Sequence, residues 1–118
     1  MKRILLIISL VLVVILTSIG YFLYENFYSM SHLPLGKEIY RSTSPEGNYK
    51  LKIYLVQGGL TTDSSIRGEI MNDKNQSRNI YWSYHESKAK VQWINDTTVS
   101  INGHILNVLH DTYDWRRK

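Results

Sequence analysis

The sequence of 118 residues contains no cysteine. This absence excludes disulfide bonds, a lipid-modified N-terminal cysteine, thiolate metal sites and a cysteine nucleophile. Any folded part of the chain must therefore depend on core packing and hydrogen bonds alone.

Recognisable catalytic motifs are missing as well. The chain has no glycine-rich phosphate loop, no His-Glu-x-x-His pattern and no nucleophile elbow. Its length leaves room for one small folded domain, which excludes a large enzyme with several sites. We therefore expect a protein that is not an enzyme and that needs no cofactor.

Positive charge is scarce away from the two ends of the chain. Five of the 14 lysine and arginine residues lie at positions 2, 3 and 116–118, which leaves nine against ten acidic residues. A nucleic-acid-binding domain gathers its basic residues on one folded face. The balanced interior therefore predicts no nucleic-acid partner, although the sequence pI is about 9.3.

One long apolar run dominates the N-terminal part. Of the 21 residues from Ile4 to Tyr24, 17 are apolar and none is charged. At about 1.5 Å per residue, a helix of this length covers the ~30 Å hydrocarbon core of a bilayer. The run predicts a transmembrane helix over residues 4–24 with the lipid bilayer as its partner. Its membrane-spanning residues include Ile4, Leu10, Val14, Leu16 and Tyr24.

The residues at the ends of the run predict its orientation. Positive charge is retained on the cytoplasmic side, so residues 1–3 are expected inside and the chain beyond the run outside. Aromatic rings at the far end suit the membrane interface. The expected interface residues are Lys2, Arg3, Tyr21, Phe22, Phe27 and Tyr28. These features predict a single-pass protein of the cytoplasmic membrane.

A cleaved signal peptide is the alternative interpretation of the same run. A short basic start, an apolar stretch and the small residues Ser18 and Gly20 match such a peptide. Cleavage near Gly20 would give a secreted protein. Apolar and aromatic residues continue past Gly20 without a polar break, which favours a retained anchor.

Residues 25–43 are expected to form a juxtamembrane connector. Pro34 and Gly36 interrupt any helix that continues from the membrane. The remainder, residues 44–118, shows the alternation of an antiparallel sheet. We predict an all-β exported domain, an antiparallel meander that forms a small sandwich or a partly closed barrel. Its strands are expected at Tyr49–Gln57 and within 66–71, 79–84, 89–94 and 99–108.

Turn lengths predict how these strands pair. A two-residue turn at Asn102-Gly103 places Val99 opposite Leu106, and a three-residue loop at 95–97 places Trp93 opposite Val99. A four-residue loop at 85–88 would add residues 79–84 to the same sheet. One face then carries the apolar side chains of Ile80, Trp82, Tyr84, Val91, Trp93, Val99, Ile101, Leu106 and Val108.

A sheet with one apolar face needs a cover. The strand from Tyr49 to Gln57 and the C-terminal Tyr113 and Trp115 are the candidates, and a second copy or a partner protein are alternatives. If Ile70 pairs with Ile80, Gly68 lies opposite Trp82 and leaves room for the indole. The oligomeric state is not predicted.

Few residues are candidates for a functional site. Asp63, His85, Glu86 and His104 are the plausible participants in acid–base chemistry, although turn and core-rim roles explain each of them as well. Asp111 and Asp114 flank Tyr113, but two carboxylates are too few to predict a cation site. We therefore assign no catalytic residue and no metal site.

Several short motifs together resemble a known family. They are Ser44–Tyr49, Gly58-Gly59, Ile66–Glu69, Asn79–Trp82, Tyr84–Glu86, Val91–Trp93, Ile101–His104 and Asp111–Asp114. Their combination resembles a family of small uncharacterised single-span membrane proteins of Gram-positive bacteria, some of them carried on prophages. The resemblance covers about residues 44–117. It implies a bacterial membrane protein with a domain of unknown function.

Three hypotheses follow. The first is a membrane-anchored interaction module with a partner in the cell envelope or membrane. The second is an envelope-acting enzyme that uses Asp63, His85, Glu86 and His104. The third is a regulatory subunit that acts through its transmembrane helix, although no small-xxx-small pattern supports helix association.

Overall fold

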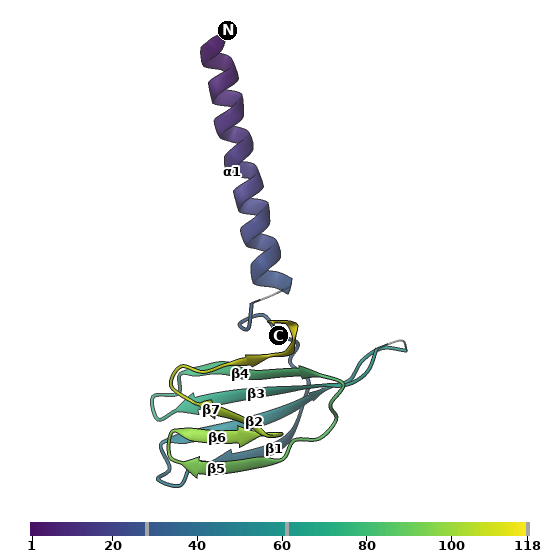
Figure 1. Ribbon diagram of the computed structural model, residues 1–118, viewed down its shortest axis with the longest axis vertical. Coiled ribbons are helices and arrows are strands. Elements are labelled where there is room, and N and C mark those ends of the chain that lie inside the picture. Colours follow the sequence, from purple (N-terminus) through teal and green to yellow (C-terminus); the bar gives the residue numbers. More distant parts are fainter. Residues whose placement is uncertain (28, 61, 118) are drawn as a thin grey trace. The chain divides into compact units, whose positions relative to one another are not determined.

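The computed structural model describes residues 1–27, 29–60 and 62–117. The chain forms two compact units, residues 1–32 and residues 33–118, and each is described by itself. The first contains one helix and the second contains the strands (Figure 1).

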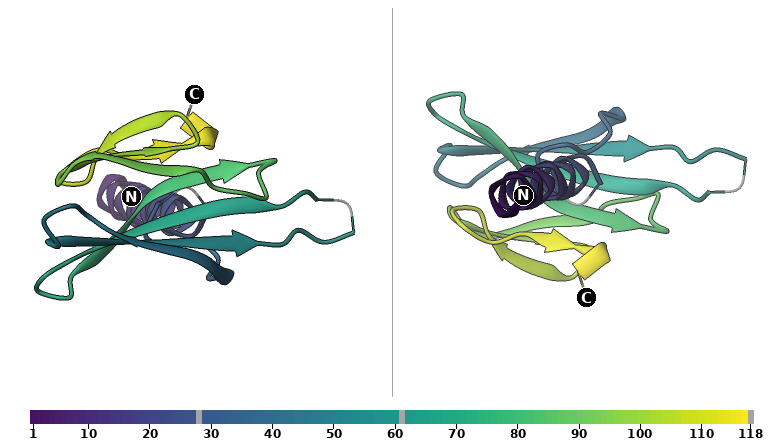
Figure 2. Two further views of the ribbon diagram at one scale, coloured as in Figure 1. Left: turned by 90° about the horizontal axis from the view of Figure 1, so that it is seen from below. Right: turned by 90° about the horizontal axis from the view of Figure 1, so that it is seen from above.

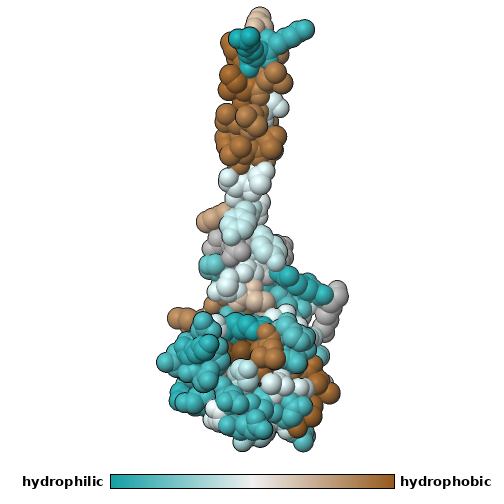
Figure 3. Space-filling view, turned by 90° about the vertical axis from the view of Figure 1, so that its left-hand side faces the viewer, coloured by the Kyte–Doolittle hydropathy of each residue, from teal (hydrophilic) through white to brown (hydrophobic). Residues whose placement is uncertain are grey.

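The helix α1 spans Lys2–Phe27, which confirms the helix expected from the apolar run. Within it, the hydroxyls of Thr17 and Ser18 each donate a 2.8 Å hydrogen bond to the carbonyl four residues earlier. Each hydroxyl therefore has a hydrogen-bond partner within the helix, as polar groups in the hydrocarbon core of a membrane would need. The side chains described in the helix are exposed, and apolar ones gather over its surface (Figure 3).

Among the described residues, one helix is long and apolar enough to cross a membrane, over Lys2–Tyr24. A signal sequence would meet the same criterion. Of the expected interface residues, Tyr28 and the side chain of Phe27 lie outside the described parts.

Eight strands occur in the described part of the second unit. They are β1 (Lys37–Thr43), β2 (Tyr49–Val56), β3 (Ser65–Asn72), β4 (Ser77–Tyr84), β5 (Val91–Asn95), β6 (Thr98–Ile101), β7 (His104–Asn107) and β8 (Tyr113–Asp114), followed by the 3-10 turn η1 (Trp115–Arg117). They form a five-stranded sheet in the order β1-β2-β3-β4-β8 and a three-stranded sheet in the order β5-β6-β7. Figure 2 shows the two layers, in which the three-stranded sheet runs from green to yellow-green and the yellow strand β8 belongs to the five-stranded sheet. The small all-β sandwich is therefore confirmed.

The core lies between the two sheets. Both sheets supply its buried apolar side chains, which are Leu51, Ile53, Ile66, Ile70, Ile80, Tyr81, Val99, Ile101, Leu106 and Val108. The predicted cover is confirmed for β2 and for Tyr113, which packs against this core. Trp115 instead stacks on Tyr84, with 5.2 Å between ring centroids.

The predicted meander is correct for two hairpins and wrong for a third. Val99 pairs with Leu106 and Trp93 with Val99, as predicted. The predicted three-residue loop at 95–97 is wrong, because Asn95 pairs with Thr98 and a bulge between Trp93 and Asn95 keeps Trp93 opposite Val99. Strands β4 and β5 do not pair, because the chain leaves the large sheet after Tyr84 and crosses to the small one. His85 has a φ of 66° at this exit. The crossing lets one chain supply both apolar faces, so each sheet covers the other.

The predicted apolar face of β4 is also wrong in part. Ile70 pairs with Arg78 and not with the predicted Ile80, and a bulge at Ile80 then places Tyr81, not Trp82, opposite Gly68. Tyr81 is fully buried in the core between the sheets, whereas Trp82, although only 9% exposed, and the half-buried Tyr84 do not belong to this core cluster. A β-carbon on Gly68 would lie 2.9 Å from that of Tyr81. The glycine therefore makes room for a phenol ring and not for the expected indole.

The connector is shorter than predicted. Residues 37–43, assigned above to the connector, form β1 at the edge of the large sheet. Most of this strand is exposed, so its sequence lacks the alternation that marks a half-buried strand. Trp93 Nε1 donates a 2.9 Å hydrogen bond to Ser42 Oγ, which ties β5 of one sheet to β1 of the other.

Candidate functional site

The four candidate acid–base residues fall into two groups. In the first, His85 Nδ1 lies 3.0 Å from Asp63 Oδ2, and the Asp63 amide donates a 2.9 Å hydrogen bond to the Tyr84 hydroxyl oxygen. Hydrogen bonds from His85 and from the Ser64 amide lower the pKa of Asp63. Both members of the pair are exposed to solvent. The pair thus positions a carboxylate and an imidazole at the surface, in water.

Glu86 turns away from this pair into a second group. Its carboxylate accepts hydrogen bonds from the Tyr81 hydroxyl and from Asn102 Nδ2, the latter at 3.0 Å. Burial, followed by the bond to Glu86, raises the pKa of the Tyr81 phenol. The phenol therefore stays protonated and serves as a donor at neutral pH.

Asn102 joins this network to the chain that crosses between the sheets. Its Oδ1 accepts a 2.7 Å hydrogen bond from the Lys90 amide, and its Nδ2 donates at 3.0 Å to the Lys88 carbonyl. The residue has a φ of 50° in the β6–β7 turn, where asparagine is tolerated. The Tyr81–Glu86–Asn102 network thus fixes the crossing segment onto the end of the small sheet.

His104 belongs to the same group through aromatic contacts. Its ring stacks on Tyr113, with 3.8 Å between centroids and 25° between planes. Tyr113 also stacks on Tyr81 at 5.3 Å. The structure therefore places Glu86 and His104 around Tyr81, apart from the Asp63–His85 pair. Sequence reasoning missed Tyr81, because its bulged register hid it on the expected outer face.

Asp111 and Asp114 have protein donors as partners. Asp111 accepts a 2.8 Å hydrogen bond from the Asn107 amide and contacts His110 Nδ1 at 3.0 Å. Asp114 pairs with Arg116 at 2.7 Å; burial opposes its ionisation, yet the hydrogen bonds from Arg116 keep its pKa lowered. Across the described residues, no cluster of three or more histidine, cysteine, aspartate or glutamate side chains could hold a metal ion.

A buried arginine lies on the outer face of the large sheet. Arg67 is only 4% exposed, and its guanidinium lies 4.0 Å from the centroid of the Tyr54 ring. It donates to Glu69 at 3.1 Å, to Asn79 at 2.8 Å and to the Leu35 carbonyl at 2.8 Å. Arg67 thus holds the connector residue Leu35 against the sheet. The position of Arg67 in an alternating strand did not predict that its side chain would be buried.

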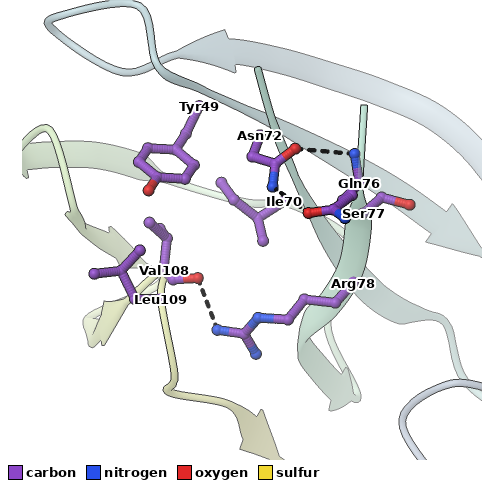
Figure 4. Close-up of a pocket in the computed structure, with 8 residues that line it drawn as sticks. All are labelled: Tyr49, Ile70, Asn72, Gln76, Ser77, Arg78, Val108 and Leu109. Carbon is purple, nitrogen blue, oxygen red and sulfur yellow. Dashed lines mark hydrogen bonds between the residues drawn. The ribbon is translucent and has the colours of Figure 1, made fainter. Parts of the chain in front are cut away.

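A pocket of about 250 Å³ opens between β2, β3, β4 and the segment that follows β7. Figure 4 shows its lining residues, which are Tyr49, Ile70, Asn72, Gln76, Ser77, Arg78, Val108 and Leu109. Ile70 and Val108 are core residues, so the pocket is a place where the core reaches the surface. Sequence reasoning missed this pocket, because three stretches distant in sequence form it, at residues 49, 70–78 and 108–109.

The Arg78 side chain crosses one side of the pocket. Its Nη2 donates a 2.7 Å hydrogen bond to the Val108 carbonyl, and its Nη1 donates at 3.2 Å to the Asp111 carbonyl. Burial lowers the pKa of Arg78, and the charge of Asp111 opposes that shift. The guanidinium stays charged and is held in a fixed position.

The chain belongs to a family of unknown function, DUF5412, whose model matches residues 2–118. The match includes the apolar helix as well as the sandwich. No curated protein and no solved structure matches the chain. The family assigns the protein to a class without giving an activity, so a functional proposal must rest on the structure.

Proposed function

We propose that α1 anchors the protein in a bacterial cytoplasmic membrane with its N-terminus inside, and that the sandwich acts outside as a non-catalytic interaction module. The uncharged run from Ile4 to Tyr24 supports the anchor, because its length matches the hydrocarbon thickness. Lys2 and Arg3 before the run support the orientation. A protein of the envelope or of the membrane is the proposed partner.

The observation that carries the interaction role is the closure of the sandwich by its own two sheets. The core side chains of one sheet are covered by those of the other, so the fold needs no second copy to bury them. Surface strands and loops of the module are then available for a partner. Most of β1 and the β3–β4 turn is exposed.

The positions of the acid–base candidates support a non-catalytic role. Asp63 and His85 are paired in open solvent, where water is not excluded from an acid–base couple. The Glu86 carboxylate is engaged by Tyr81 and Asn102 in a network that holds the fold together. The four candidates therefore fall into two separate groups and do not meet at one position.

The test is chemical crosslinking of the full chain in its native membrane, followed by purification and identification of the partner. A second chain carries an unrelated apolar span in place of residues 4–24. We expect both chains to capture the same partner, because the sandwich is the binding element. Capture that is lost with the exchanged span would overturn this proposal and assign the function to the helix.

A further inference from the structure

The pocket in Figure 4 combines an apolar floor with one cation, and no carboxylate lines it. We propose that this pocket binds a small monocarboxylate whose apolar body is about the size of one six-membered ring. The proposal goes beyond the interaction role, because it concerns a small-molecule site and holds on either side of a membrane.

The size of the pocket sets the size of the ligand. Its volume of about 250 Å³ falls just below the range of about 300–1,000 Å³ typical of sites for drug-sized ligands. It exceeds the roughly 150 Å³ of an engineered apolar cavity that binds benzene. A single ring with one polar substituent therefore fits within the pocket.

The charge of the lining sets the polar group. Arg78 is the one charged residue among the lining residues, and two carbonyl oxygens hold its guanidinium in place. A guanidinium has five N–H donors, and these two bonds use two of them. The carboxylate of Asp111 is engaged by the Asn107 amide and by His110. A bound carboxylate would therefore give Arg78 an anionic acceptor within the pocket.

The remaining lining residues suit the body of such a ligand. Ile70 and Val108 form an apolar floor and are 4% and 2% exposed. Leu109 lies at the rim with 57% of its surface exposed, so a ring in the pocket would cover apolar surface that water now contacts. Tyr49, Gln76 and Ser77 add an aromatic ring and polar groups around the opening.

The test uses methyl NMR of the full chain in detergent micelles, with benzoate as the probe and benzamide as its uncharged counterpart. We expect benzoate to shift the methyl resonances of Ile70, Val108 and Leu109, with a Kd on the order of 1 mM for so small a ligand. Benzamide should bind about tenfold more weakly, because it has no charge for Arg78. The core methyls of Val99 and Ile101 should not shift.

A matched pair of variants tests the charge without touching Arg78. Leu109→Glu adds a negative charge at the exposed rim, and Leu109→Gln adds a neutral side chain of the same shape. We expect Leu109→Glu to bind benzoate about tenfold more weakly than Leu109→Gln, with equal affinity of both for benzamide. Unshifted pocket methyls, equal binding of benzoate and benzamide to the unaltered chain, or equal benzoate affinity of the two variants would each overturn the proposal.

Discussion

The ring of His104 in β7 stacks on the ring of Tyr113 in β8 with 3.8 Å between their centroids. These strands are the edges of different sheets, so the contact joins the two layers along one side. On the opposite side, Trp93 bonds to Ser42 and joins β5 to β1. The sandwich is thus connected at both edges as well as through its core.

We expect the His104–Tyr113 stack to contribute coupling energy to folding. A double-mutant cycle with His104→Leu and Tyr113→Leu should give about 0.5–1.5 kcal/mol of coupling, the range for aromatic pairs. The measurement is urea unfolding of the full chain in micelles, with tryptophan fluorescence as the signal that reports unfolding. The same cycle between His104 and Lys74, which lies in the exposed β3–β4 turn, should be additive. Coupling of equal size in both cycles would refute the role of the stack.

Gly68→Ala should destabilise the sandwich. The added β-carbon would lie 2.9 Å from the Tyr81 β-carbon, and overpacking of a core costs about 1–3 kcal/mol. In thermal unfolding, each kcal/mol lowers the Tm of a domain of this size by about 4–8 °C. Gly59→Ala is the control, because its β-carbon would meet Thr62 Oγ1 at an ordinary 3.8 Å. Similar Tm values for the two variants would contradict the bulged register of β4.

Tyr81→Phe should lower stability at neutral pH by about 1–3 kcal/mol, because the Glu86 carboxylate loses a buried donor. The pKa of Tyr81 is raised in the folded state, so its contribution is complete below the ordinary phenol value near 10. It is lost as the pH rises toward the folded pKa.

The difference in unfolding free energy between the unaltered chain and Tyr81→Phe should therefore shrink in alkali. Urea titrations at several pH values measure it. Tyr40→Phe, at an exposed position in β1, is the control and should change little at any pH. A Tyr81→Phe difference that grows with pH would show that the phenol is not a donor in the folded state.

Asp96→Asn should remove a contribution to the stability of the fold that is present at neutral pH and is lost in acid. Hydrogen bonds from Ser44 and Asn48 lower the pKa of Asp96, and its Oδ1 also accepts from the Glu46 amide at 2.9 Å. A lowered pKa gives stability that is present above the ordinary value near 3.8 and is lost as the pH falls through the folded pKa.

Acid unfolding at a series of pH values checks this expectation. The unaltered chain should be more stable than Asp96→Asn at pH 7, and the two should converge in acid. Asp73→Asn, in the exposed β3–β4 turn, removes the same charge and should leave the acid profile as it is. If Asp96→Asn retains the full acid dependence, the bond between the β1–β2 and β5–β6 turns does not stabilise the fold.

Local patterns were enough to predict the elements whose pairing depends on short turns. The Asn102-Gly103 turn and the alternation around it predicted the β6–β7 register. Alternation also predicted Trp93 opposite Val99, but not the bulge between Trp93 and Asn95 that shortens the loop before β6. The crossing after Tyr84 was not predictable in this way, because alternation is the same whether β5 continues the first sheet or starts another.

The errors in the candidate site have similar causes. One bulge at Ile80 exchanged the faces of Tyr81 and Trp82, and no residue type marks such a bulge in the sequence. The separation of His85 from Glu86 depends on the backbone at the end of β4. The burial of Arg67 depends on Leu35 and Tyr54, which come together only in the folded sheet.

In the proposed topology, the helix spans the membrane and the sandwich lies outside. Because the chain has no cysteine, one added cysteine reports its own location. In Lys74→Cys, the added thiol lies in the exposed β3–β4 turn. The decisive measurement is labelling of this variant in intact bacteria with a membrane-impermeant maleimide, with recovery of the full-length chain in the membrane fraction. We predict labelling without lysis; labelling that appears only after lysis would contradict the account.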